Sequence, residues 1–260
     1  MAIVNANKRT FILDKTRQGG FFVYCFMALW ENTKSIVEDF VSLFYPQLCL
    51  ICNENLLKEE ECICIACLHQ TPKTDCFLQK ENMVSKRFWG RVKLENAAAL
   101  FQFKKQGNAQ KLIHPLKYEG DKTIGIFLGK QLAFSIRDSK FFEGINLIMP
   151  VPLHLTKEKI RGYNQSNYIV KGINEILQLE VNFKSLIRIE NTDSQTRKKR
   201  FSRWENMMNS FSLKDSQKLK NKHILLVDDV ITTGSTLEAC AQKLLEVEGV
   251  KVSVVTIAVT

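Results

Sequence analysis

The chain of 260 residues contains 45% hydrophobic and 25% charged residues, a globular composition that excludes a largely disordered protein. Lysine and arginine outnumber the acidic residues by 37 to 27, which gives a formal net charge of +10. This excess is compatible with polyanionic partners such as nucleic acid, phosphorylated metabolites or a membrane surface, but it selects none of them.

The first 46 residues are expected to form a loose tail and an amphipathic helix. Residues 1–20 are polar, whereas apolar residues between about 21 and 44 recur at three- and four-residue steps. The apolar run at 21–30 follows basic residues, but no small-residue cleavage site comes after it, and it is too short to span a bilayer. We therefore expect a cytoplasmic protein without stable membrane insertion, rather than an exported or anchored one.

Residues 47–80 are expected to form a small zinc-ribbon-like module. Two C-x-x-C pairs, Cys49 with Cys52 and Cys64 with Cys67, are separated by eleven residues. Four thiolates at such spacing can surround Zn²⁺ tetrahedrally in a closed structural site. Cys62 is a further candidate ligand, and a disulfide or redox pair is the alternative that an oxidising compartment would favour.

From about residue 95 to residue 260, strands and helices alternate. Strands are expected at 97–103, 145–151, 223–227 and 250–259, and helices at 109–118, 124–136, 164–177 and 235–247. Strands separated by helices favour an α/β domain with a mostly parallel sheet flanked by helices.

The segment after the strand at 223–227 has the chemistry of a ribose-phosphate site. Asp228 and Asp229 follow the strand, then a turn rich in hydroxyls and glycine, then a helix from about Ser235. A helix N-terminus favours a phosphate, and adjacent carboxylates suit vicinal ribose hydroxyls and Mg²⁺. The alternative is a plain strand–turn–helix junction capped by Ser235. A Walker-type ATPase is excluded because no G-x-x-x-x-G-K-[ST] loop occurs.

Several further motifs occur in the same chain as this run, VDDVITTGST. They are the two cysteine pairs, KYEGD at 117–121, PVPLHLTKEKIRGYNQS at 150–166 and SQTRKKRFSRWENMMNSF at 194–211. Together they resemble the ComF-like family of competence proteins, which combines a type I phosphoribosyltransferase fold with an N-terminal zinc finger. The resemblance covers about residues 30–260, and the motifs occur in the family's order.

The resemblance implies a site for phosphoribosyl diphosphate and Mg²⁺. Asp228 and Asp229 would contact the ribose hydroxyls, and with Arg161 they are the candidate catalytic residues. Other implied ligand-binding residues flank the diphosphate or hold the 5′-phosphate: Val151, Pro152, Thr232, Thr233, Gly234, Ser235 and Thr236. A basic loop that closes over the ligand would contain Lys198, Arg200 and Arg203, and Lys157 and Lys159 could assist from the segment before Arg161.

Two hypotheses about function remain open at this point. The first is a Mg²⁺-dependent phosphoribosyltransferase linked to DNA uptake, although no residue identifies its acceptor. The second is a non-catalytic protein of DNA import that binds single-stranded DNA, or serves the uptake machinery as a scaffold, through the basic face of the same fold. Residues available for stacking on bases would be Tyr163, Phe201 or Trp204.

Overall fold

The computed structural model describes residues 3–6, 9–12, 45–189 and 210–260, and it divides the chain into two compact units, Met1–Gln47 and Leu48–Thr260. In the first unit, β1 (Ile3–Ala6) pairs antiparallel with β2 (Arg9–Ile12), where a loose tail was expected. β-branched residues in both strands favour this pairing, although most residues of the segment 1–20 are polar. The expected helix and apolar run between residues 21 and 44 lie outside the described residues.

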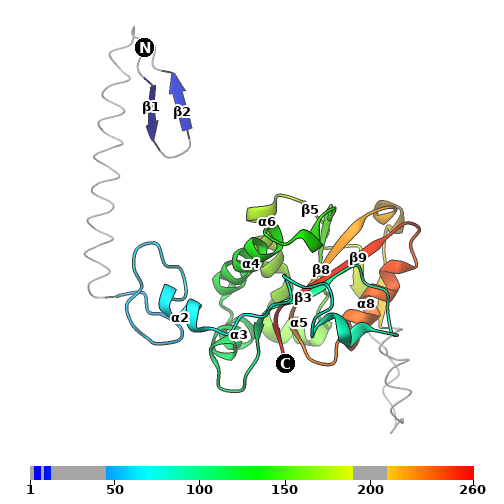
Figure 1. The fold of residues 1–260 in the computed structure, drawn as a ribbon, viewed down its shortest axis with the longest axis horizontal. Coiled ribbons are helices and arrows are strands. Elements are labelled where there is room, and N and C mark those ends of the chain that lie inside the picture. The colour runs from blue at the N-terminus through cyan, green and yellow to red at the C-terminus, as the bar shows by residue number, and fades with distance from the viewer. Residues whose placement is uncertain (1–2, 7–8, 13–44, 190–209) are drawn as a thin grey trace. The chain divides into compact units, whose positions relative to one another are not determined.

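A five-stranded sheet forms the centre of the second unit (Figure 1). Its order is β3-β9-β8-β4-β5, and all pairings are parallel. The strands are β3 (Ala97–Gln102), β4 (Leu147–Pro150), β5 (Glu180–Val181), β8 (His223–Ile231) and β9 (Lys251–Val259). Long apolar runs in β8 and β9 are buried, as strands covered on both faces require.

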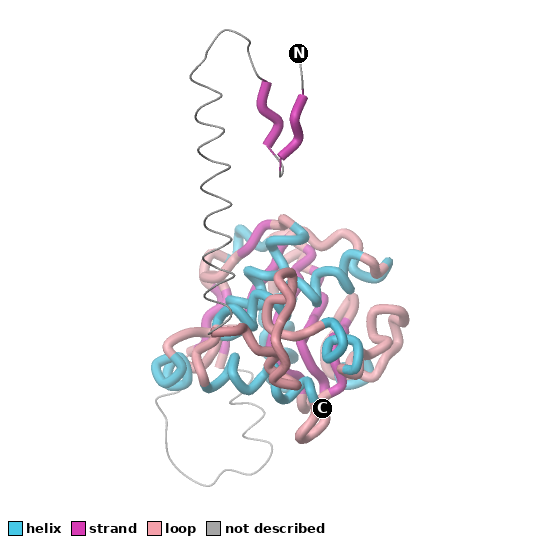
Figure 2. Tube along the Cα trace, turned by 90° about the vertical axis from the view of Figure 1, so that its left-hand side faces the viewer, coloured by secondary structure: helices cyan, strands magenta, loops and turns pink. Residues whose placement is uncertain are grey.

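Helices cover both faces of this sheet, with α4 and α6 on one side of β8 and β9 and α8 on the other (Figure 1). Figure 2 shows the same strands between helices from a second direction. The helices are α3 (Asn108–Tyr118), α4 (Lys122–Arg137), α5 (Leu155–Arg161), α6 (Gln165–Leu177) and α8 (Ser235–Leu245). The predicted α/β fold with a mostly parallel sheet is confirmed.

Shorter elements complete the described chain. They are α2 (Ile65–Gln70), the antiparallel pair β6 (Leu186–Arg188) and β7 (Phe211–Leu213), and the 3₁₀ helices η1 (Ser85–Phe88), η2 (Lys140–Phe142) and η3 (Ser216–Leu219). Across the described ranges, no helix has both the length and the apolar character needed to cross a bilayer.

The cysteine-rich segment packs on the α/β part within the second unit. Lys130 of α4 binds Glu61, with 3.0 Å between nitrogen and oxygen, and Lys111 of α3 donates to the carbonyl of Ile51 at 3.0 Å. The backbone N–H of Thr74 donates to the carbonyl of Leu100 in β3 at 2.9 Å. These contacts lie inside one compact unit. The boundary expected between a module at residues 47–80 and a domain at residues 95–260 therefore stays a prediction.

Candidate functional site

Two acids of β8 form the centre of the site. β8 pairs with β9 as far as Ile231 but with β4 only as far as Val227, so Asp228 and Asp229 lie beyond the end of β4. The strand is therefore longer than predicted, and the acids belong to it rather than following it. The Ser166 hydroxyl donates to Asp228 at 3.1 Å, and the Lys117 ammonium lies 2.9 Å from the carboxylate of Asp229.

The surroundings of Asp228 raise the pKa of its carboxyl group towards neutral pH. Burial raises the pKa of Asp228 to about 7, and the adjacent Asp229 carboxylate adds to the rise. The N–H of Asp229, the Lys117 ammonium and the Ser166 hydroxyl act in the opposite direction because each stabilises the charged form. A cation or a pair of ribose hydroxyls at this point would further favour the charged form.

The loop after β8 leads directly into the N-terminus of α8. Thr232 and Thr233 are exposed, and Gly234 adopts a left-handed conformation with φ +80° as the N-cap residue. The hydroxyls of Thr233 and Ser235 lie 3.1 Å apart. Gly234 rather than Ser235 is the N-cap residue, so the alternative in which Ser235 caps the helix is wrong, and the Thr233 hydroxyl accepts from the N–H of Ser235 at 3.5 Å. The first N–H groups of such a helix lack intrahelical acceptors and can bind an anion.

The sequence RGYNQS forms the corner between α5 and α6. Arg161 donates to the side-chain oxygen of Gln165 at 2.9 Å, and its guanidinium lies 5.6 Å from the ring centre of Tyr118. Gly162 ends α5 with φ +76°. Arg161 is thus held near the C-terminal end of α3, the helix that also supplies Lys117.

The rest of this corner connects the loop after β4 with the acids. Tyr163 is buried, and its hydroxyl donates to the carbonyl of Leu116. Asn164 donates to the carbonyl of Val151 at 2.9 Å and accepts from the N–H of Ser166 at 3.1 Å. The suggestion that Tyr163 is available for stacking is therefore wrong, because its ring packs inside the protein.

The loop after β4 lies beside β8 at the residue that precedes the two acids. The N–H of Val151 donates to the carbonyl of Val227 at 2.9 Å, and Pro152 is half-buried. Lys157 and Lys159 are exposed on α5. Other residues that the sequence suggested lie outside the described residues, namely Lys198, Arg200, Phe201, Arg203 and Trp204.

Several residues that contact the acids and the loop have no role that the sequence predicts. Ser166 and Lys117 lie within the motifs at 150–166 and 117–121, and these motifs were the only indication in the sequence that the two residues belong to the site. Arg91 donates to the carbonyl of Thr233 at 3.0 Å and pairs with Glu238 of α8. Glu238 is 147 residues away from Arg91 along the chain, so no local pattern could have indicated the pair.

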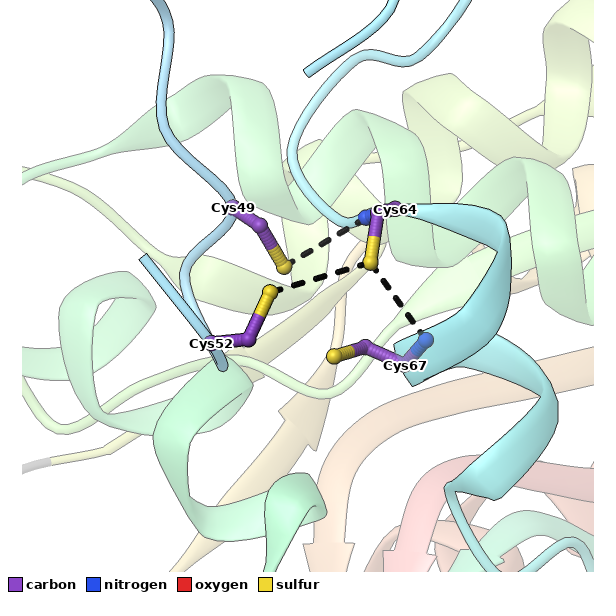
Figure 3. A group of neighbouring side chains, drawn as sticks. All are labelled: Cys49, Cys52, Cys64 and Cys67. Carbon is purple, nitrogen blue, oxygen red and sulfur yellow. Dashed lines mark hydrogen bonds between the residues drawn. The ribbon is translucent and has the colours of Figure 1, made fainter. Parts of the chain in front are cut away.

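Four cysteines form a second candidate site (Figure 3). The sulfurs of Cys49, Cys52, Cys64 and Cys67 all lie within 4.8 Å of one another. Those of Cys52 and Cys64 are 3.8 Å apart, which equals the edge of about 3.8 Å expected for a tetrahedron with Zn–S bonds near 2.3 Å. Cys62 is not part of this group.

Backbone donors and charge repulsion also fit a metal at these four sulfurs. Burial opposes ionisation of Cys49, but N–H groups of Cys52, Cys64 and Ile51 outweigh it and lower its pKa to about 6. Burial and the neighbouring sulfurs raise the pKa of Cys67 to about 12. Four thiolates this close need a cation to be charged together, so the cluster could hold Zn²⁺.

Comparison with known proteins relates part of the chain to a family. Residues 154–260 match the phosphoribosyl transferase domain family. Competence protein F of Haemophilus influenzae is 34% identical over 145 residues, which cover 54% of this chain and 62% of that protein. DNA utilization protein YhgH of Escherichia coli K12 is 31% identical over 137 residues, covering 52% and 60%. The matches thus span about three fifths of the length of these two relatives.

A more distant relative matches over a longer region. Competence protein ComFC of Bacillus subtilis is 26% identical over 225 residues, which cover 76% of this chain and 89% of that protein. A solved hypoxanthine phosphoribosyltransferase of Staphylococcus aureus aligns with 54% of this chain and 63% of its own, at 20% identity and a TM-score of 0.30, a likeness too weak to bear on the site. These relatives make the chain similar to the ComF-like competence proteins, and the domain match at residues 154–260 together with the parallel sheet gives it a type I phosphoribosyltransferase fold.

Proposed function

We propose that this protein binds phosphoribosyl diphosphate with Mg²⁺ at the end of β8 and that this binding serves DNA uptake. The observation that carries the proposal is the sequence of features along β8 and α8. Two carboxylates lie in the second half of a largely buried strand, and a hydroxyl-rich loop then leads into a helix N-terminus whose N-cap residue is Gly234. Ligands of open α/β sheets bind at this edge, outside the carboxyl ends of the strands.

Each part of the ligand has a matching part of the site. The ribose hydroxyls would donate to Asp228 and Asp229, and the 5′-phosphate would accept N–H and hydroxyl hydrogen bonds from residues 232–236. The diphosphate would face the loop at Val151 and Pro152, within reach of the basic segment that ends in Arg161. Bound Mg²⁺ would supply positive charge to the diphosphate oxygens, and Asp228 and Asp229 are the carboxylates that could hold it.

Transfer of the phosphoribosyl group to an acceptor is the catalytic form of this proposal. The C1–oxygen bond would break with its electron pair leaving on diphosphate, while the ribose carbon becomes positive and bonds to the acceptor. Arg161 could stabilise the charge on the leaving group, and Asp228 and Asp229 would keep the ribose in place. Because no residue identifies the acceptor, binding is the primary claim.

The connection to DNA uptake comes from the relatives. Two of them are named as competence proteins and one as a DNA utilization protein. None of these names describes a reaction. We therefore carry over to this chain only a role in handling incoming DNA or the nucleotides derived from it.

A thermal-shift assay tests the binding claim. Phosphoribosyl diphosphate with Mg²⁺ should raise the unfolding midpoint, because a ligand that binds only the folded state stabilises it. The double variant Asp228→Asn/Asp229→Asn should lose this shift. Glu246→Gln, at the opposite end of α8, removes an exposed carboxylate and should keep the shift. Absence of a shift in the unaltered protein at millimolar ligand would refute the proposal.

A second candidate function is the binding of single-stranded DNA. The ring of Tyr118 is 68% exposed and lies under the guanidinium of Arg161, which is the type of surface on which bases stack. Affinity for an oligothymidylate should fall steeply with salt, and Tyr118→Ala should weaken it more than Tyr45→Ala, which removes another exposed tyrosine. Equal effects of the two substitutions would remove Tyr118 from this role.

A further inference from the structure

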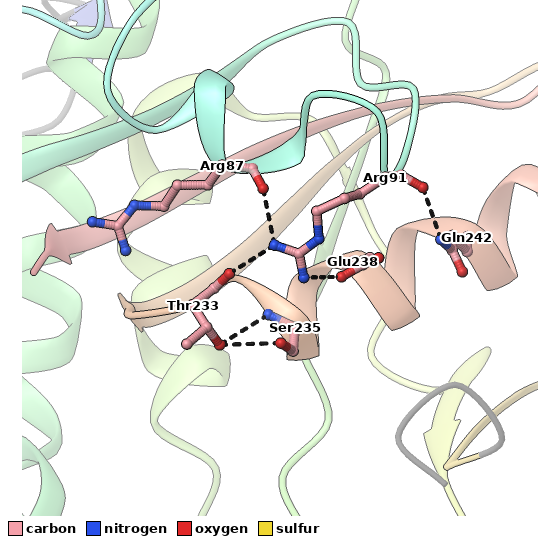
Figure 4. A network of polar contacts seen from close by, with 6 residues as sticks. All are labelled: Arg87, Arg91, Thr233, Ser235, Glu238 and Gln242. Carbon is pink, nitrogen blue, oxygen red and sulfur yellow. Dashed lines mark hydrogen bonds and ion pairs between the residues drawn. The ribbon is translucent and has the colours of Figure 1, made fainter. Parts of the chain in front are cut away.

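A segment outside the matched phosphoribosyl transferase domain lies directly against the loop after β8. Arg91, which follows η1, donates one guanidinium nitrogen to the carbonyl oxygens of Arg87 and Thr233, at 2.9 Å and 3.0 Å. Its other terminal nitrogen pairs with the carboxylate of Glu238 in the first turn of α8 (Figure 4). One side chain therefore connects the loop to the helix that follows it.

The backbone of the same segment is fixed to α8 as well. Gln242 donates its side-chain amide to the carbonyl of Arg91 at 3.0 Å. The buried ring of Phe88 lies so close to Gly234 that a Cβ built there would come within 3.2 Å of it. The loop after β8 thus packs against the ring of Phe88 and is hydrogen-bonded to the guanidinium of Arg91.

The direction of the Thr233 carbonyl matters for an anion site. In Figure 4, this carbonyl points to Arg91, whereas the Thr233 hydroxyl points to Ser235. A carbonyl oxygen facing a phosphate would repel it, whereas hydroxyls and N–H groups attract it. The contact with Arg91 therefore favours the loop conformation that presents donors.

The second role of Arg91 is electrostatic. Glu238 is only 2% exposed, and a buried carboxylate in the first turn of α8 would oppose a phosphate at the N-terminus of that helix. A buried charge without a partner is also strongly destabilising. Arg91 neutralises this carboxylate while remaining on the opposite side of the loop from the Ser235 hydroxyl.

We propose that Arg91 is a positioning residue for the phosphate loop, which it keeps receptive to an anion by holding the Thr233 carbonyl and neutralising Glu238. The inference rests on the proposed function. It goes further by making phosphate affinity depend on a segment that is distant in sequence. Arg91 does not touch the ligand and acts through Thr233 and Glu238.

Calorimetric titration with phosphoribosyl diphosphate and Mg²⁺, alongside urea unfolding without ligand, tests this role. Arg91→Lys keeps a positive charge near Glu238 but loses the planar fork that reaches both partners. It should retain most of the stability while weakening affinity about fivefold to tenfold. Arg87→Met is the matched control, because that guanidinium donates instead to the carbonyl of Thr260. It should leave affinity unchanged.

A double variant covers the case in which removing Arg91 alone prevents folding. Arg91→Met/Glu238→Gln removes the buried carboxylate together with its partner, so it should fold, yet affinity should still fall about tenfold because the Thr233 carbonyl has lost its donor. If the unaltered protein binds and both Arg91 variants bind with the same affinity, the inference is overturned but the proposed function is not. Failure of the unaltered protein to bind either phosphoribosyl diphosphate or pyrophosphate would overturn the proposed function and the inference together.

Discussion

At the scale of a single residue, two opposing effects act on the charge of Asp228. It lies in a buried strand that disfavours charge, and it faces the Ser166 hydroxyl and the N–H of Asp229, which favour charge. The result is a carboxyl group with a pKa of about 7 next to Asp229, which is paired with Lys117. Such a group can gain or lose its charge when a ligand arrives.

This raised pKa predicts a pH dependence of stability with a definite sign. Between about pH 4 and pH 7 the folded protein keeps a proton on Asp228 that the unfolded chain releases, so the free energy of unfolding falls as pH rises. Asp228→Asn should therefore stabilise the protein at pH 8 by on the order of 1–2 kcal/mol, relative to its effect at pH 4. Urea unfolding at the two pH values measures this difference, and a larger gain at pH 4 would contradict it.

The residues of the candidate site were predictable from sequence only where they are contiguous. The acids and the loop at 228–236 occur in one run, and strand, turn and helix each have local signatures. Lys117 and Ser166 reach the acids from two other helices, and Arg91 reaches Glu238 across the fold. Such contacts depend on how elements pack, which no short pattern contains.

At the scale of elements, the junction of β8 and α8 depends on Gly234. Its φ of +80° is unfavourable for a residue with a side chain, and an added Cβ would press on Phe88. Gly234→Ala should therefore lower the free energy of unfolding by about 1–3 kcal/mol. Gly120→Ala is a matched control, because φ there is +77° but nothing lies within 4 Å of the added Cβ. Equal losses in the two variants would exclude a specific role for Phe88.

The cysteine cluster is the second element for which a prediction follows. We expect the purified protein to contain one zinc ion per chain, and Cys52→Ser should remove it and lower the unfolding midpoint. Cys62→Ser is the control, because the sulfur of Cys62 is not among the four that lie within 4.8 Å of one another. Metal analysis checks both, and zinc retained by Cys52→Ser but lost from Cys62→Ser would contradict the assignment of ligands.

Element boundaries show where sequence patterns stop being informative. Helical periodicity predicts α3, α4, α6 and α8 closely, because each buries one apolar face in the core. It misses α5, whose residues are mostly exposed, and it ends β8 too early because the acids are not apolar. Pairing with β9 extends β8 to Ile231, and that pairing is a tertiary effect.

At the scale of the whole molecule, the cysteine-rich segment and the sheet belong to one compact unit. The sequence suggests two separate parts at 47–80 and 95–260. The contacts of Lys111 and Lys130 connect them, and η1 and Arg91 lie in the segment between them. The overall α/β architecture was predictable because alternating strands and helices fix the fold class, whereas contacts between distant segments were not.

The measurement that tests the central claim most directly is a crystal structure of the protein with phosphoribosyl diphosphate and Mg²⁺. We predict density for the ribose at Asp228 and Asp229 and for the 5′-phosphate at residues 232–236, with the Arg91 contact to Thr233 intact. Ligand density elsewhere, or an empty loop at a concentration that saturates binding in solution, would contradict it.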